Sequence, residues 1–187
     1  MEYSKYVSKS VDYASYQELF VIKSENPDDY HYGEYIPMNQ HRSSRLDRTF
    51  KLSEEQIKLA QECSPRTWLV ISEHWCGDAS QIVPVMAKIA QASQGKINFQ
   101  LVYRDEVPKL MQAHLTNGGM SVPKLIQLDE NSELINDWGP RPKAAQEMVI
   151  KLKSDPETAA NYIEELHKWY AKDKQQSTVS ELMELIS

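Results

Sequence analysis

The feature that most constrains the fold is a short apolar run that ends in a cysteine-containing turn. Residues 67–72 (TWLVIS) are rich in β-branched and aromatic side chains, which favours a buried strand. The turn 73–77 follows, and an amphipathic segment begins directly after it. This order places Cys76 at the end of a strand and at the N-terminus of a helix. Because a helix N-terminus stabilises anions, we expect the pKa of the Cys76 thiol to be lowered.

The pattern from residue 67 onward predicts the order strand, helix, strand, helix, strand, strand, helix. The second strand is predicted over residues 97–103, and a hairpin over residues 122–128 and 133–138. The first helix carries Pro84 within its buried stripe. We therefore predict an α/β fold, with a βαβ unit and a ββα unit in one sheet that has helices on both faces.

Helical patterns lie on both sides of this predicted core. Apolar residues from Tyr13 to Phe20 have helical spacing, and Asp155-Pro156 is typical of the cap and first turn of a helix. We therefore divide the chain into three parts: an N-terminal helical extension packed on the core (residues 1–66), the core itself (67–152) and a C-terminal helical extension (153–187).

The N-terminal extension is rich in tyrosine, with seven tyrosines between Tyr3 and Tyr35. We expect these rings to pack the extension onto the core, because tyrosine buries a large apolar area. A platform on which a ligand stacks is the alternative.

Composition and charge restrict the classes of function. A net charge of -6 argues against general nucleic-acid binding, which needs a basic face. No apolar run is long enough for a transmembrane span, so we expect no membrane partner. The first residues lack the basic and apolar regions of a signal peptide, and two cysteines, Cys63 and Cys76, fit a reducing compartment. We expect a cytoplasmic protein.

Two segments resemble a known family. Trp75-Cys76-Gly77-Asp78-Ala79 resembles the thioredoxin active-site segment Trp-Cys-Gly-Pro-Cys, and Pro84 stands at the spacing from Cys76 that thioredoxins show. Val122-Pro123 resembles the second signature, a hydrophobic residue before a cis-proline that sits against the active-site cysteine. The resemblance covers about residues 67–152 and implies a thioredoxin-like fold. It also implies a catalytic thiol at Cys76, and it marks as site-shaping Trp75, Gly77, Asp78, Ala79, Val122 and Pro123.

The sequence departs from the thioredoxin pattern at the second cysteine. Ala79 stands where the resolving cysteine would be, and Val70 replaces the carboxylate that the family places six residues before its nucleophile. Cys63 cannot act as the partner, because the predicted strand between the cysteines spans about 20 Å. A disulfide needs Cα atoms within about 7 Å. The resemblance therefore implies one active thiol that lacks a partner.

The neighbours of Cys76 are expected to modulate its thiol. Glu73 and Asp78 would raise its pKa by like-charge repulsion, whereas a protonated His74 would favour the thiolate. Trp75 is expected either to shield the thiol and present an apolar docking surface or to pack in the core. Three charged residues follow other strands: Arg104, Asp105 and Arg141. We expect them to be solvated loop charges, and a ring of charges around the site is the alternative.

A metal site is not expected in this segment. Glu73, His74, Cys76 and Asp78 carry ligand atoms, but their spacing does not match a zinc pattern and a second paired cluster is missing. We therefore expect no metal and no cofactor.

Three functions remain open on the sequence. The first is a single-thiol protein that forms mixed disulfides with a client protein or a low-molecular-weight thiol such as glutathione, which an external thiol then resolves. The second is a non-catalytic thioredoxin-fold interaction module with an apolar patch around Trp75 and Pro123. The third is glutathione-dependent iron–sulfur binding, as in single-cysteine glutaredoxins. Those carry Cys-Gly-Phe-Ser, whereas Asp78 would place a negative charge near an anionic cluster.

Overall fold

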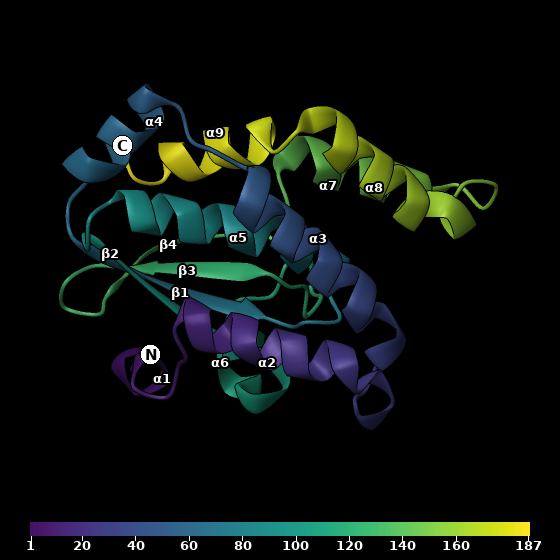
Figure 1. The fold of residues 1–187 in the computed structure, drawn as a ribbon, viewed down its shortest axis with the longest axis horizontal. Helices are drawn as coiled ribbons and strands as arrows, with labels where there is room; N and C mark the ends of the chain where they lie inside the picture. Colours follow the sequence, from purple (N-terminus) through teal and green to yellow (C-terminus); the bar gives the residue numbers. More distant parts are fainter.

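The computed structural model describes residues 1–187 and is built on a four-stranded mixed sheet with the order β2-β1-β3-β4 (Figure 1). Strand β1 (Arg66–Ser72) runs parallel to β2 (Ile97–Tyr103) and antiparallel to β3 (Lys124–Leu128). Strand β4 (Leu134–Trp138) pairs antiparallel with β3 at the other edge. The strand that leads into the cysteine turn therefore has a neighbour on each side.

The connections follow the predicted order of elements. Helix α5 (Gly77–Ala92) links β1 to β2, and a 3-10 turn (Arg104–Glu106) with the short helix α6 (Pro108–Ala113) links β2 to β3. Helix α7 (Lys143–Ser154) follows the β3–β4 hairpin. The predicted α/β fold, with a βαβ unit and a ββα unit, is confirmed.

Alternate side chains of β1 enter two separate cores. Trp68 and Val70 belong to the larger core with α5, whereas Leu69 and Ile71 belong to the smaller core with α6. Figure 1 shows α5 on one side of the strands and α6 and α1 (Ser4–Val7) on the other. Both faces of β1 are covered, which explains why its sequence is continuously apolar.

Helices before β1 pack onto the larger core. They are α2 (Tyr13–Glu25), α3 (Ile36–Thr49) and α4 (Glu54–Glu62), with 3-10 turns at Pro27–Asp29 and Gly33–Tyr35. The helix predicted from Tyr13 to Phe20 is confirmed, because Tyr16 and Phe20 are buried in that core. None of the helices combines the length and the hydropathy needed to cross a membrane.

The C-terminal helices α8 (Tyr162–Asp173) and α9 (Gln176–Glu184) share the same core through buried side chains such as Tyr170 and Leu182. Here one expectation was wrong, because no helix begins at Asp155. Its carboxylate accepts a hydrogen bond from the Glu157 amide at 2.9 Å and so closes a tight turn instead of capping a helix.

Candidate functional site

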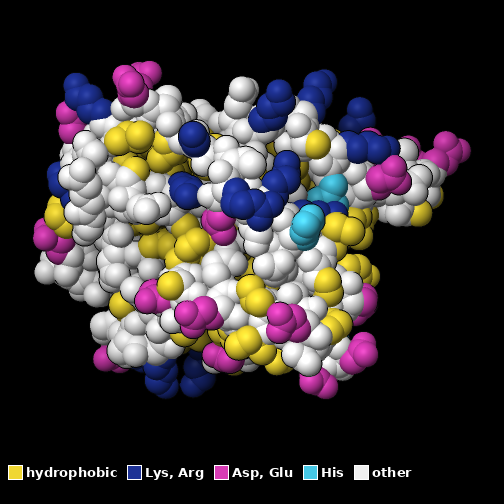
Figure 2. Space-filling view, in the orientation of Figure 1, with side chains coloured by type: hydrophobic (Ala, Val, Ile, Leu, Met, Phe, Trp, Pro, Cys, Tyr) yellow, Lys and Arg dark blue, Asp and Glu magenta, His cyan; other side chains and the backbone are white.

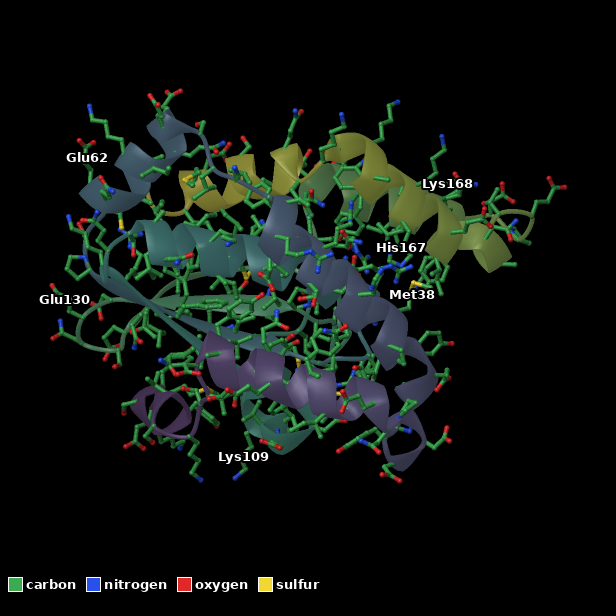
Figure 3. All side chains as sticks on the ribbon, viewed as in Figure 1. Met38, Glu62, Lys109, Glu130, His167 and Lys168 are labelled. Atoms are coloured by element: carbon green, nitrogen blue, oxygen red, sulfur yellow. The ribbon has the colours of Figure 1, made fainter.

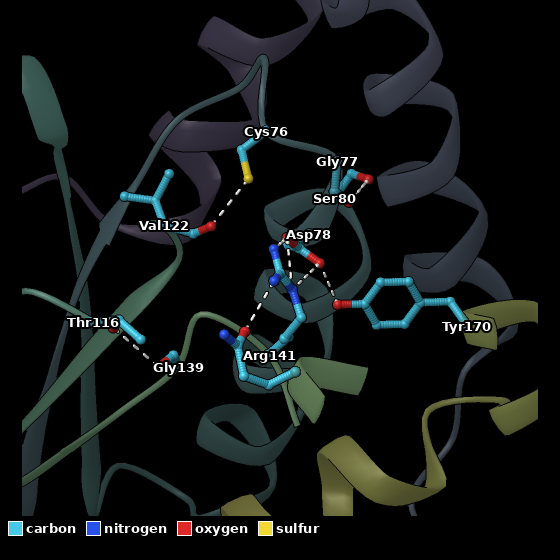
Figure 4. A network of polar contacts seen from close by, with 10 residues as sticks. Cys76, Gly77, Asp78, Ser80, Thr116, Val122, Gly139, Arg141 and Tyr170 are labelled. Carbon is cyan, nitrogen blue, oxygen red and sulfur yellow. Dashed lines mark hydrogen bonds and ion pairs between the residues drawn. The ribbon is translucent and has the colours of Figure 1, made fainter. Parts of the chain in front are cut away.

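Cys76 joins the two segments that carry the family resemblance. It is the N-cap residue of α5, and its Sγ donates a hydrogen bond of 3.1 Å to the carbonyl oxygen of Val122 (Figure 4). The peptide bond between Val122 and Pro123 is cis. Cys63 is the C-cap residue of α4, before the opposite end of β1, and both cysteines are free. The cysteine turn and the proline segment therefore meet at one thiol.

The sequence sets the helix N-terminus and the neighbouring carboxylates against each other at Cys76, and in the structure the net shift of the thiol pKa is upward. Burial, with the nearby Asp78 charge as the second cause, raises the pKa of the thiol to about 12. Hydrogen bonds from the Ala79 and Asp78 amides lower it, as does Arg141, but burial outweighs them. The thiol is therefore protonated at neutral pH, which is the state that can donate to Val122.

A buried ion pair lies directly behind the thiol. The Asp78 carboxylate of α5 accepts from Arg141 Nη2 at 2.5 Å, from Arg141 Nε at 3.1 Å and from the Tyr170 hydroxyl of α8 at 2.6 Å (Figure 4). The Asp78 and Arg141 side chains are only 8% and 14% exposed. Arg141 is thus not the solvated loop charge that its position suggested. Three elements far apart in the sequence are joined at this carboxylate.

Glu73 and His74, the predicted modulators, point away from the site. His74 is 1% exposed, its ring stacks on Phe20 and its Nε2 lies 3.1 Å from the Tyr16 carbonyl oxygen. Burial lowers the pKa of His74 to about 3, so at neutral pH it supplies no positive charge to the thiol. The Glu73 carboxylate accepts from the Asp105 amide at 3.4 Å, and burial raises its pKa.

A cleft of ≈ 740 Å³ opens over the cysteine turn. Its floor contains Trp75, Cys76, Gly77 and Asp78, whereas the predicted site residues Ala79, Val122 and Pro123 do not line it. Arg104 and Arg141 contribute from the loops after β2 and β4. The remaining walls come from the turn before α3 (Tyr32, Glu34 and Tyr35), from α3 itself (Met38, Asn39 and Arg42) and from α8 (Tyr162, Ile163, Leu166 and His167).

Trp75 is held in place by the N-terminal helices. Its backbone carbonyl accepts a hydrogen bond of 2.8 Å from Asn39 Nδ2, and its ring meets Tyr32 edge-on with centroids 5.2 Å apart. The Arg104 guanidinium lies 4.7 Å from the ring centroid, a cation–π contact. Trp75 is half-buried and also packs on both cores, so it fits both of its expected roles.

Sequence reasoning missed the outer half of the cleft, because it is built by helices outside the resemblance. The tyrosine cluster was the one available signal. Tyr3 and Tyr16 are buried, as the packing hypothesis expects. Tyr32 and Tyr35, however, are 45% and 52% exposed and line the cleft, as the platform alternative expects. No local pattern indicated Arg42 or His167.

Comparison with known proteins supports this architecture. A family model described as thioredoxin matches residues 26–159, more than half of the chain. The chain belongs to the thioredoxin family. A protein of unknown function from Pseudomonas aeruginosa has a similar structure, with a TM-score of 0.70 at 15% identity over 100% of this chain and 97% of that one. An HIV epitope-scaffold protein has a TM-score of 0.67 at 13% identity over 100% and 98%. These likenesses show the thioredoxin-like fold, and no curated protein matches the chain.

We predict that the substitution Asp78→Asn destabilises this thioredoxin-family protein by about 3–5 kcal/mol, because it leaves the buried Arg141 guanidinium unpaired. The free energy of unfolding from urea titration checks this. The double variant Asp78→Asn/Arg141→Gln should lose clearly less stability than the sum of the two single variants. Additive losses would show that the two side chains do not stabilise each other.

Burial of His74 predicts a pH-dependent stability. Its folded-state pKa of about 3 lies below its ordinary value of 6.5, so between these pH values the unfolded chain binds a proton that the folded chain does not. The His74 contribution is fully present above pH 6.5 and is lost as the pH falls toward 3, with a slope of up to about 1.4 kcal/mol per pH unit. Urea titrations between pH 7 and pH 4 measure the slope.

The matched control for this prediction is the exposed His41. The variant His74→Gln should flatten the slope, whereas His41→Gln should leave it unchanged. An unaltered slope in His74→Gln would contradict the role assigned to His74.

Proposed function

We propose that this thioredoxin-family protein binds a partner protein in the cleft around Cys76 and does not run a dithiol cycle. The observation that carries the proposal is the state of the thiol. Cys76 donates a hydrogen bond to Val122, and burial raises its pKa to about 12. Attack on a disulfide requires a thiolate. A protonated thiol that already has a hydrogen-bond partner is better suited to binding than to exchange.

The residues that replace the second cysteine support the same conclusion. Ala79 is 2% exposed and is packed in the larger core, so it offers no chemistry to the cleft. Asp78 uses its carboxylate to bind Arg141 and Tyr170. The first turn of α5 therefore carries a structural ion pair where a dithiol protein carries its resolving cysteine.

The lining of the cleft suits a protein ligand. Aromatic, methionine and arginine side chains are enriched at protein interfaces. The cleft is lined by residues of these types, namely Trp75, Tyr32, Tyr35, Met38 and Arg42.

Single-thiol exchange is the second candidate, favoured by the position of Cys76 on the floor of the cleft. In that reaction the Cys76 thiolate would attack one sulfur of a disulfide in a client protein or in oxidised glutathione. The old S–S bond breaks, a mixed disulfide forms and the other sulfur leaves as a thiolate. An external thiol then attacks the mixed disulfide and restores Cys76. No contact of the site favours the iron–sulfur alternative.

A comparison of variants separates the two candidates. Affinity capture with the full chain should recover the same partners with Cys76→Ser as with the native protein, because binding needs no thiolate. Tyr35→Ser should lose these partners, since Tyr35 is half exposed on the cleft wall. The control Ile150→Ser changes a side chain that is equally exposed, at 52%, but lies on α7 outside the cleft.

Partners that disappear with Cys76→Ser and are released by dithiothreitol would contradict the binding proposal and support exchange. Partners that survive in Tyr35→Ser as well as in Ile150→Ser would place their binding surface outside the cleft.

A further inference from the structure

We infer that the cleft takes a peptide segment of a partner protein in which an acidic side chain binds beside Arg42, flanked by apolar side chains. This inference rests on the proposed binding function and names the chemistry of the ligand.

The first observation is that Arg42 has no acidic partner. Its guanidinium donates to the Asn39 Oδ1 at 2.9 Å and forms no ion pair. The other two arginines of the cleft are paired, Arg104 with Asp105 at 2.8 Å and Arg141 with Asp78 at 2.5 Å. A guanidinium carries five N–H donors in a planar fork that fits a carboxylate. Arg42 is therefore a half-buried cation with donors to spare on the cleft wall.

The second observation is an imidazole beside Arg42 that makes no hydrogen bond. His167 lies on α8, and its Nδ1 is buried without a partner. A side-chain carbon at Gly77 would meet the His167 ring at 3.1 Å, so the glycine leaves room for the imidazole over the cysteine turn. Burial lowers the pKa of His167, and the Arg42 charge is the second cause. Because Nδ1 is shielded from solvent, a ligand bound at Arg42 would meet the Nε2 edge of the ring, which faces Gly77.

No acidic group of the chain forms an ion pair with Arg42. Asp78 is occupied by Arg141 and Tyr170, and Glu164, in the adjoining hollow, pairs with Lys168 at 2.8 Å. Glu34 lies exposed on the cleft wall and forms no ion pair. Figure 2 shows Lys and Arg atoms gathered next to His atoms where α3 and α8 meet, although the whole chain carries a net charge of -6. Charge complementarity therefore favours an anionic group at this place.

The third observation is that exposed apolar side chains line the cleft, which favours a peptide over a small acid. Tyr32, Tyr35, Met38 and Ile163 are between 45% and 57% exposed and all line the cleft. Figure 3 shows Met38 and His167 on the same side of the molecule, where α3 faces α8. A small carboxylic acid would fill only the Arg42 end. An acidic residue between apolar residues of a peptide would also cover the apolar walls.

The test uses the peptide acetyl-Leu-Phe-Glu-Leu-amide, its neutral counterpart acetyl-Leu-Phe-Gln-Leu-amide and free N-acetylglutamate. Dissociation constants are measured by NMR titration of the full ¹⁵N-labelled chain, with the Trp75 indole and Gly77 amide signals as reporters of the cleft. We expect the Glu peptide to bind at least about tenfold more tightly than the Gln peptide, the effect of one charge-assisted hydrogen-bonded pair. We expect N-acetylglutamate to bind more weakly than either peptide.

Arg42→Gln should reduce the preference for the Glu peptide to within about twofold. Its matched control is Arg45→Gln, which removes an exposed arginine from the same helix outside the cleft and should keep the preference. Equal binding of both peptides, or a preference that survives in Arg42→Gln, would overturn the acidic inference while the binding function stands. Binding of N-acetylglutamate as tight as that of the Glu peptide would assign the site to small acids. If none of the three probes shifts the NMR signals of the cleft, the inference is overturned. The capture experiment with Tyr35→Ser would still decide the proposed function.

Discussion

The buried pair of Asp78 and Arg141, with the Tyr170 hydroxyl on the same carboxylate, is the interaction on which the site depends. It fixes the first turn of α5, the loop after β4 and α8 relative to one another. A buried charge is tolerated only when it is paired and hydrogen-bonded, so these three elements cannot separate without a large cost. The ion pair therefore holds the floor of the cleft around Cys76 in place, and the Asp78 carboxylate has a structural role.

The helices at the two ends of the chain build the outer walls of the cleft around this frame. Asn39 of α3 holds the backbone of the cysteine turn through the Trp75 carbonyl, and α2 buries His74 between Tyr16 and Phe20. The Cys76 side chain lies half-buried on the floor of the cleft, and burial raises its pKa. The amides at the N-terminus of α5 lower the pKa of Cys76, which would favour exchange. Burial raises the pKa by more. The extensions thus supply the outer walls of the cleft.

Local patterns predicted the parts of the molecule that depend on local physics. The apolar run before Cys76, the helix after it and the segment at Pro123 all lie where the sequence indicated. The failures concern long-range contacts. Arg141 reads as a solvated loop charge until the fold brings it to Asp78, 63 residues away in the sequence. The pKa of Cys76 likewise depends on burial in the folded chain, which no local pattern indicates.

Burial holds the Cys76 thiol protonated on the floor of the cleft. The most direct test is a pH titration of the thiolate absorbance near 240 nm in the Cys63→Ser variant, which leaves Cys76 as the sole cysteine. We predict no thiolate at neutral pH and a midpoint above about pH 10, beyond the ordinary cysteine value of about 8.5. A midpoint below about pH 8 would contradict it and return Cys76 to the role of a nucleophile.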